Sequence, residues 1–318
     1  NGAAADNLFR AMGLDYRYVA DGNDTEALIA AFAAVKDSQK PVVIHIHTQK
    51  GKGLSFAEDD PEDWHRHAPF HTESGAVKHP SSPDPCLAAT VDFVLAEAKR
   101  NPNFVYLSAG IVGGIGLTPA ERAELGAQYV DVGIAEEHAV AMASGLARGG
   151  ARPVFGTYST FYQRTYDQMA QDVAVNNNPA VFLSTYATLY GMNDVTHLGF
   201  FDIPLFANIP NLVFLAPAGL EEYLAVLRWA LAQTAHPVMI RVPVMGYETS
   251  PYPVRTDYSA LNLYQVVTEG AEVAIIGAGN FAQMASDAAA ELAKDGVHAT
   301  VINPIFLSGL DTELLDGL

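Results

Sequence analysis

Short, unbroken runs of Val, Ile, Leu and Phe alternate with segments of helical periodicity through the middle of the chain. Strands that are buried on both faces appear in a sequence as such runs, and the helices between them are the crossovers of a parallel sheet. The expected strands are 104–107, 154–156, 181–184, 212–216 and 238–242, and the expected helices include 87–99, 139–147 and 220–231. The pattern predicts an α/β fold with a parallel sheet that helices cover on both sides.

The segments on either side of this region carry different patterns. Asp24 can cap a helix that places Leu28 and Phe32 on one face, and a buried strand is expected at 42–46. The stretch 50–85 is rich in Gly, Pro, Asp and His, as linkers are. After a second boundary the chain shows a strand at 273–276, a helix at 281–294, a strand at 299–302 and the start of another helix. We therefore predict three parts, 1–80, 81–250 and 251–318, of which the last is shorter than a typical domain.

Composition restricts the partners and the compartment. The 318 residues include 18 basic and 36 acidic side chains, a formal net charge of -18, and no run of Lys and Arg, so nucleic acid is not an expected partner. The single cysteine, Cys86, cannot form an internal disulfide, which favours a reducing, cytoplasmic compartment. No apolar stretch approaches the ~20 residues of a membrane span, so no membrane partner is expected either.

Two motifs have simple structural explanations. The segment 277–282 follows a strand and opens a helix with Gly-Ala-Gly, as a dinucleotide-binding turn does, but the next strand ends at Asn303 without an acidic residue to hold a ribose. Tight packing at a crossover also requires such glycines, and we favour that explanation. His65, His67 and His71 crowd one loop, but no obvious fourth ligand accompanies them, so no metal site is expected within this chain.

The most informative region runs from Asp131 to Asp202. Residues 131–135 read as a strand that delivers Glu136 and Glu137 to the start of a helix, where the helix dipole favours carboxylates. The dipole alone accounts for both glutamates. It does not account for the aromatic, hydroxyl and basic side chains at 158–164, or for the polar segment 193–197. Because ligands bind at the carboxyl ends of parallel strands, we expect a binding site here.

These residues resemble a known family. Segments 131–138 and 158–168, with the motif Thr196-His197-x-Gly199-x-x-Asp202, resemble the pyrimidine-binding domain of thiamine-diphosphate enzymes of the transketolase group, most closely the deoxyxylulose-phosphate synthases. Residues 47–53, and Asp60-Pro61 with His65, resemble the end of that family's first domain. The resemblance implies a thiamine-diphosphate-binding fold in which a pyrimidine-binding domain, 81–250, lies between the end of a diphosphate-binding domain, 1–80, and the start of a C-terminal domain, 251–318.

The resemblance also implies roles for single residues around the cofactor. Glu136 corresponds to the glutamate that hydrogen-bonds the aminopyrimidine ring and promotes its imino form, whose nitrogen then removes the thiazolium proton. Phe161 corresponds to the aromatic side chain that stacks on the pyrimidine. Further cofactor contacts are expected from Lys50, Ile111 and Tyr158.

A second set of residues is expected to face the substrate. His65 and His197 correspond to histidines that contact substrate oxygens and relay protons, which makes them catalytic residues together with Glu136. Arg164 corresponds to a basic residue of the substrate channel. The expected substrate contacts are Tyr158, Arg164, Tyr186, Asn193 and His197.

Four positions depart from the family pattern. Tyr186 and Val244 stand where the synthases have arginines that grip the phosphate of the aldehyde acceptor, Asn193 replaces an aspartate and Leu54 replaces a tyrosine. Two lost charge-assisted contacts, each worth roughly 1.5–3 kcal/mol, weaken the binding of a phosphorylated acceptor. Arg164 alone can still hold a phosphate, so glyceraldehyde 3-phosphate stays among the candidate acceptors.

The activity implied by the resemblance is that of a transferase of aldehyde or ketone residues. Such an enzyme decarboxylates pyruvate, or takes a two-carbon unit from a ketose, and adds the unit to an aldehyde; a homodimer is implied as well. The family's Gly-Asp-Gly segment and downstream Asn, which hold Mg²⁺ and the diphosphate, have no counterpart here, so these ligands are expected outside this chain. A piece of a longer chain is favoured over half of a two-subunit enzyme, and a non-catalytic binding partner is the alternative function.

Overall fold

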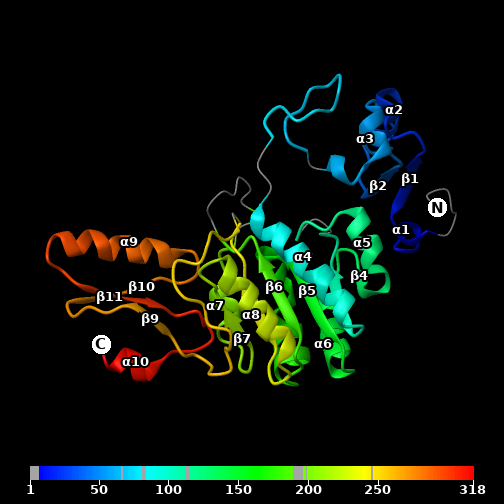
Figure 1. Cartoon of the computed structure of the whole chain (residues 1–318). Coiled ribbons are helices and arrows are strands. Elements are labelled where there is room, and N and C mark those ends of the chain that lie inside the picture. Colours follow the sequence, from blue (N-terminus) through cyan, green and yellow to red (C-terminus); the bar gives the residue numbers. More distant parts are fainter. Residues whose placement is uncertain are drawn as a thin grey trace. The chain divides into compact units, whose positions relative to one another are not determined.

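The computed structural model describes residues 7–65, 67–80, 84–111, 115–188, 196–197, 199–244 and 246–318 (Figure 1). The chain forms two compact units, residues 1–82 and 83–318. Within the described residues, every helix is too short or too polar to cross a lipid bilayer.

The first unit is built on a pair of parallel strands. Its first elements are α1 (Leu8–Ala11), β1 (Asp15–Val19), α2 (Thr25–Ala33) and β2 (Val42–Ile46), and β1 pairs with β2 over their whole length. Asp24 caps α2 as predicted, because its carboxylate accepts a hydrogen bond from the Glu26 amide at 2.9 Å. The prediction that 42–46 is buried is wrong: its residues are half-buried or exposed, and α2 buries none of its side chains. Two strands and two short helices enclose too little volume for an apolar core.

The stretch expected to be a linker carries local structure of its own. It contains α3 (Ser55–Asp59) and η1 (Asp63–His65). Trp64 is the centre of an aromatic cluster, because its ring stacks on His67 at 4.0 Å and meets the rings of Phe56 and Phe70 at 4.6 and 4.7 Å. Burial of these large rings against one another holds the segment together.

The second unit contains a six-stranded sheet in which all strands run parallel, which confirms the predicted α/β fold. Its strands are β3 (Phe104–Ser108), β4 (Tyr129–Asp131), β5 (Arg152–Tyr158), β6 (Val181–Thr185), β7 (Val213–Leu215) and β8 (Val238–Arg241). Their order across the sheet is β4-β3-β5-β6-β8-β7. β3 has β4 on one side and β5 on the other, so the strand order reverses at β3. In parallel α/β sheets, ligands bind at the carboxyl ends of the strands near such a reversal.

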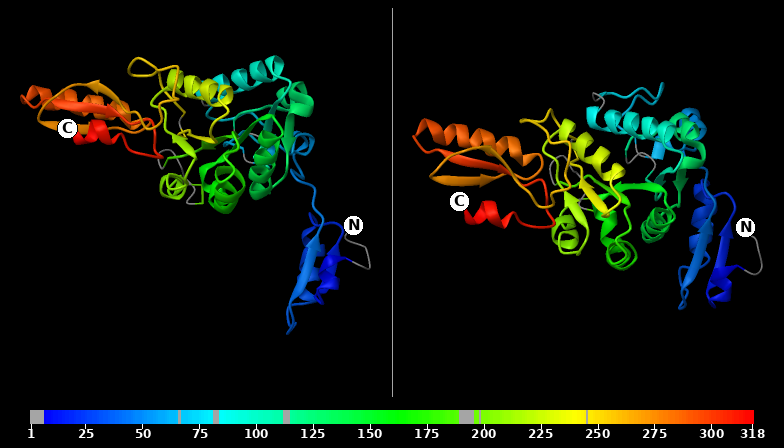
Figure 2. Two further views of the ribbon diagram at one scale, coloured as in Figure 1. Left: turned by 90° about the horizontal axis from the view of Figure 1, so that it is seen from below. Right: turned by 60° about the horizontal axis from the view of Figure 1, so that its bottom comes forward.

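Helices cover both faces of this sheet (Figure 2). The first face carries α4 (Pro85–Arg100), α5 (Pro119–Leu125) with η2 (Gly126–Gln128), and α8 (Leu220–Ala232); the second carries α6 (Glu136–Arg148), η3 (Ser159–Thr165), η4 (Gln168–Ala174) and α7 (Asp202–Phe206). Asp84 caps α4 by accepting from the Cys86 amide at 2.8 Å, and Pro85 occupies the first turn. Cys86 is thus a helix residue, and burial raises the pKa of its thiol to about 11.

The second face of the sheet is apolar along its middle and polar at the carboxyl ends of its strands. One row of paired residues crosses five strands and belongs to the buried core: Leu107, Phe155, Phe182, Met239 and Phe214. Side chains two residues apart on a strand point to the same face. The row two residues further along, Thr157, Ser184 and Arg241, therefore lies on this same face and is polar.

A smaller sheet follows the parallel one. It comprises β9 (Gln265–Thr268), β10 (Val273–Ile276) and β11 (Ala299–Asn303) in the order β10-β11-β9, with α9 (Phe281–Lys294) and α10 (Thr312–Asp316). The chain after β11 runs beside β7, because the Leu307 amide donates to the Phe214 carbonyl at 2.7 Å. A Cβ atom at Gly277 would lie 2.8 Å from the Phe281 carbonyl oxygen, so this glycine allows close helix–strand packing, as favoured from the sequence.

The apolar row generates a stability prediction. Phe182 is fully buried in the middle of the sheet, so Phe182→Ala should lower the free energy of unfolding by about 3–5 kcal/mol. Phe281→Ala removes the same atoms from a side chain that is 54% exposed and should change that free energy by less than about 0.5 kcal/mol. Urea unfolding of the complete protein, followed by fluorescence, measures both. Equal losses in the two variants would contradict the assigned core.

Candidate functional site

Glu136 is a buried carboxylate at the start of a helix. It is the first residue of α6 and is 2% exposed. Its Oε2 atom lies 3.2 Å from Nη1 of Arg164 in η3, a side chain that is 48% exposed. A buried carboxylate needs such a partner, because burial without one is costly. The positive end of the α6 dipole contributes in the same direction.

The turn before α6 differs from the predicted strand 131–135. The strand β4 ends at Asp131, and residues 132–135 form a loop. Gly133 adopts a φ of 72°, which is open mainly to glycine, and the Asp131 carboxylate accepts from the amides of Gly133 at 2.7 Å and Gly110 at 3.2 Å. These bonds turn the chain so that Glu136 enters the helix from a fixed loop rather than from a strand.

Four of the predicted site residues form one aromatic cluster at the carboxyl ends of β5 and β6. The Tyr158 ring stacks near Phe161 at 5.8 Å and contacts Tyr186 at 4.2 Å. The His197 ring meets Phe161 edge-on at 5.3 Å and Tyr158 at 6.0 Å. Tyr186 has a φ of 55°, a left-handed conformation that is strained for a side chain of this size. The cluster forms an aromatic wall in which the imidazole of His197 stands edge-on.

The segment with His197 is tied to η3. The Thr160 hydroxyl donates to the Thr196 carbonyl at 3.0 Å, and the Thr196 hydroxyl lies 2.8 Å from Nδ1 of His197. Asn193, predicted to contact substrate, lies outside the described residues. In the described part of the chain, His197 thus contacts the rings of Tyr158 and Phe161 and the hydroxyl of Thr196.

A second buried carboxylate lies at the start of α7. Asp202 is 1% exposed, and its Oδ2 atom lies 2.6 Å from Nε of Arg241, the last residue of β8. Burial raises the pKa of the Asp202 carboxyl, although the Arg241 cation acts in the opposite direction. Arg241 was not predicted as a site residue; its signal in the sequence is a charge inside the apolar run 238–242.

Buried hydroxyls lie at the same ends of the strands and were also missed. The hydroxyl oxygens of Thr157, Ser159 and Ser184 are buried and make no hydrogen bond within the described part of the chain. Buried polar atoms normally have a hydrogen-bond partner. These hydroxyls therefore mark where the apolar core ends and the polar candidate site begins along the strands. In the sequence, the signal for these hydroxyl residues is a Ser or Thr at the end of an apolar run.

The remaining predicted residues lie apart from this cluster along the chain. Lys50 and His65 belong to the first unit, where Nζ of Lys50 lies 2.5 Å from Nδ1 of His65, and Leu54 is half-buried just before α3. Ile111 is half-buried in the loop after β3, and Val244 is half-buried after β8.

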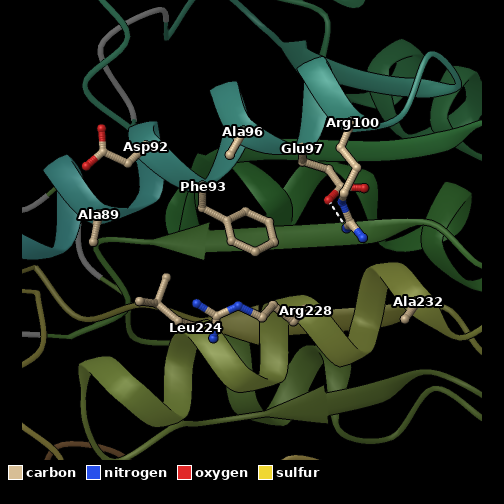
Figure 3. A pocket seen from close by; sticks show the side chains of 9 residues that line it. All are labelled: Ala89, Asp92, Phe93, Ala96, Glu97, Arg100, Leu224, Arg228 and Ala232. Atoms are coloured by element: carbon tan, nitrogen blue, oxygen red, sulfur yellow. Dashed lines mark hydrogen bonds and ion pairs between the residues drawn. The ribbon is translucent and has the colours of Figure 1, made fainter.

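A separate groove lies on the opposite face of the sheet, between α4 and α8 (Figure 3). It has a volume of about 690 Å³, and Phe93 and Leu224 line it together with charged residues that include the ion pair Glu97–Arg100. None of the predicted site residues lines it. We therefore place the candidate site at the carboxyl ends of β5, β6 and β8 and not in this groove.

The site suits one half of the expected cofactor. A buried carboxylate beside a stacked aromatic wall fits an aminopyrimidine, which has a flat ring and a ring nitrogen that needs a hydrogen-bond partner. In the described ranges, His, Cys, Asp and Glu side chains do not gather in threes that would hold a metal ion. The fit is therefore that of the pyrimidine half of the cofactor.

Three family models match the chain. The transketolase pyrimidine-binding domain matches residues 88–249, the transketolase C-terminal domain matches 264–318, and the 1-deoxy-D-xylulose-5-phosphate synthase model matches 2–48. These matches agree with the resemblance found in the sequence.

Curated relatives are similar over nearly the whole chain. The 1-deoxy-D-xylulose-5-phosphate synthase of Desulfotalea psychrophila is 38% identical over 314 residues, which are 97% of this chain and 48% of the relative. That of Clostridium acetobutylicum is 34% identical over 310 residues, 97% of this chain and 49% of the relative. The chain thus spans about half the length of the curated relatives it matches.

Solved transketolases share the fold. A split-gene transketolase described as an inactive beta4 tetramer has a TM-score of 0.60 at 23% identity, over 73% of this chain and 75% of that chain. A transketolase mutant from Pichia stipitis in complex with fructose 6-phosphate has a TM-score of 0.62 at 15% identity, over 96% of this chain and 58% of that chain. Because the pyrimidine-binding model takes in half of the chain, the protein belongs to the transketolase pyrimidine-binding domain family, and its curated relatives are 1-deoxy-D-xylulose-5-phosphate synthases.

Proposed function

We propose that this chain is the cofactor-activating part of a thiamine-diphosphate-dependent synthase of the 1-deoxy-D-xylulose-5-phosphate type. The observation that carries the proposal is the buried Glu136 carboxylate at the start of α6, tied through Arg164 to the same η3 segment that contributes Phe161. A carboxyl group held this way can share a proton with the ring nitrogen of an aminopyrimidine that stacks on the aromatic wall. The names of the curated relatives support the synthase over other transferases.

The residues of the chain divide the chemistry among them. Thiamine diphosphate, when bound, supplies the acidic carbon that carries the two-carbon unit. Glu136 holds the proton at the pyrimidine ring nitrogen, and Phe161 fixes the plane of that ring. His197, and His65 from the first unit, hold or move protons at the substrate oxygens. Lys50, Ile111 and Tyr158 complete the cofactor contacts in this proposal.

The donor and the acceptor follow from the same assignment. We propose a keto acid or ketose donor and an aldehyde acceptor, with glyceraldehyde 3-phosphate as the first candidate. Arg164, in η3, is the cation that pairs with Glu136, and its side chain is exposed enough to meet an anionic substrate. Tyr186 packs against Tyr158 at 4.2 Å, so it extends the apolar wall where a synthase would place an arginine.

Other parts of the proposal concern groups beyond this site. The ligands of Mg²⁺ and of the diphosphate are proposed to come from outside this chain, and the complete protein is proposed to act as a homodimer. The proposed domains are 1–80, the end of a diphosphate-binding domain; 81–250, the pyrimidine-binding domain; and 251–318, the start of the C-terminal domain.

A non-catalytic binding partner is the alternative function. The observation that favours it is that Tyr186 and Val244 are uncharged where the synthases have arginines. Arg164 is then the cation proposed to bind the phosphate of the acceptor. The buried Glu136 opposes it, because burying a carboxylate costs free energy that a purely structural domain gains nothing from.

Cofactor binding separates the two functions. The complete protein should bind thiamine diphosphate with Mg²⁺, measured by titration calorimetry, and Phe161→Ala should weaken this binding about 2- to 10-fold through the lost stacking. Phe281→Ala, remote in sequence on α9, should leave the affinity unchanged. Absence of binding at millimolar cofactor in the wild type would reject the enzyme function.

Glu136→Gln tests the activating acid. The amide keeps the size of the side chain but cannot exchange a proton with the ring nitrogen, so turnover of pyruvate and aldehyde should fall about 10²- to 10⁴-fold. The matched control is Glu137→Gln, the next residue in the first turn of α6, which shares the helix dipole. Steady-state rates of the complete protein measure both, and equal rates in the two variants would show that the acid is misplaced.

Acceptor choice depends on the missing arginines. Tyr186→Arg with Val244→Arg should lower the KM for glyceraldehyde 3-phosphate about 10-fold or more, because each charge-assisted phosphate contact is worth about 1.5–3 kcal/mol. The KM for unphosphorylated glyceraldehyde should stay as it was, which serves as the control. Equal changes in KM for the two aldehydes would show that the new arginines do not act through the phosphate group.

A further inference from the structure

Arg241 ends a polar row on the sheet. Thr157, Ser184 and Arg241 are paired neighbours on β5, β6 and β8, and the hydroxyls of Thr157 and Ser184 are buried without a partner in the described residues. Arg241 is the charged member of the row, and its side chain is 17% exposed. A guanidinium in this place is held by the sheet rather than by a mobile loop, so it is a fixed point beside the aromatic cluster that β5 and β6 lead into.

The side-chain hydrogen bonds of Arg241 within the described residues go to the segment that follows His197. Its Nε donates to Oδ2 of Asp202 at 2.6 Å, and its Nη2 is 3.5 Å from both Oδ1 of Asp202 and the carbonyl oxygen of Gly199. The backbone of β8 is held in turn, because the Tyr247 hydroxyl donates to the Arg241 carbonyl. The planar fork of arginine can serve two acceptors in fixed directions, which a lysine cannot.

Gly199 is also fixed by close packing. A Cβ atom there would lie 2.5 Å from Cα of Ala187, so the two backbones touch, and the Ala187 amide is bonded to the Val242 carbonyl at 3.0 Å. On the other side of His197, the Thr160 hydroxyl holds the Thr196 carbonyl at 3.0 Å. The backbone is therefore tied to the sheet after His197 and to η3 before it.

We propose that Arg241 and Asp202 are positioning residues for His197, acting as a clamp that keeps its ring edge-on to Phe161 and aimed into the site. This inference rests on the proposed function for the role of His197, but the clamp itself is a property of the protein without its cofactor. Replacement of a buried ion pair by apolar side chains of similar size is often neutral for stability. What the pair adds here is the direction of its bonds, which an apolar pair does not provide.

The conservative variants Asp202→Asn and Arg241→Lys test the clamp in the complete protein. Each keeps size and some hydrogen bonding but breaks the charged fork. In cofactor-free protein labelled at histidine, the ring signal of His197, assigned with His197→Gln, should lose the ring-current shift that Phe161 imposes. In the loaded protein, kcat should fall about 10- to 100-fold, since misplacement by about 1 Å costs that order of rate. The affinity for thiamine diphosphate and the KM for pyruvate should change less than about 3-fold, because Glu136 and Phe161 are untouched.

Two further variants keep the test decisive. Asp202→Asn combined with Arg241→Gln leaves no unpaired buried charge, so it covers the case in which a single variant does not fold, and it should show the same shifted His197 signal. Lys99→Met breaks the exposed pair Lys99–Glu124, whose atoms lie 2.7 Å apart, and should leave the signal and kcat unchanged. An unaltered His197 signal in the folded clamp variants, or an equal loss in Lys99→Met, would overturn the proposal. A wild type without cofactor binding would instead reject the proposed function, while the histidine signal would still decide the clamp.

Discussion

The row of apolar side chains that crosses five strands is the constraint on which the rest of the second unit depends. Leu107, Phe155, Phe182, Met239 and Phe214 are all fully buried, and they fix both the register of the strands and the layer of helices above them. Once this register is set, the residues two positions further along must share the same face. The polar row at the carboxyl ends is thus placed by the apolar one, and the site is a consequence of how the core packs.

Two buried carboxylates lie at this edge of the sheet, and the arginines that pair with them differ in exposure. Glu136 pairs with Arg164, whose side chain is 48% exposed, whereas Asp202 pairs with Arg241, whose side chain is 17% exposed. The exposed part of Arg164 can meet a second anion while one nitrogen stays on Glu136, because a guanidinium carries several N–H donors. Arg241 has less open surface, and its separation from Asp202 would leave a buried carboxylate unpaired. Arg164 therefore suits contact with a substrate, and Arg241 suits a structural task beside the same site.

Much of the second unit could be predicted from the sequence because its strands are buried on both faces. The runs 104–107 and 181–184 lie inside β3 and β6, and the helix 281–294 has the same bounds as α9. The strand expected at 131–135 was displaced, since the side chain of Asp131 and the positive φ of Gly133 form a turn that hydrophobicity does not show. In the first unit β1 was missed altogether, because its residues Asp15–Val19 alternate with charges and bury only Tyr16.

The site was predictable in its residue types but not in its pairing. Family resemblance indicated Glu136, Phe161 and Arg164 one by one, yet the ion pair between the first and last of these depends on how η3 lies against α6, which no spacing in the sequence encodes. Arg241 was missed for the related reason that a charge in an apolar run looks like an interruption. Its partner, Asp202, is 39 residues away along the chain, and only the order of strands across the sheet brings them together.

Charge is consistent with the proposed division of the cofactor between this chain and groups outside it. The pyrimidine half of thiamine diphosphate requires one acid and an apolar wall. The start of α6 offers the acid, and the ends of β5 and β6 offer the wall. The diphosphate half asks for a cation with oxygen ligands, and a chain of formal net charge -18 repels it unless that cation is present. In the proposed function, the two halves of the site would act together: the metal-bound diphosphate would supply affinity, and Glu136 would supply the chemistry at the ring.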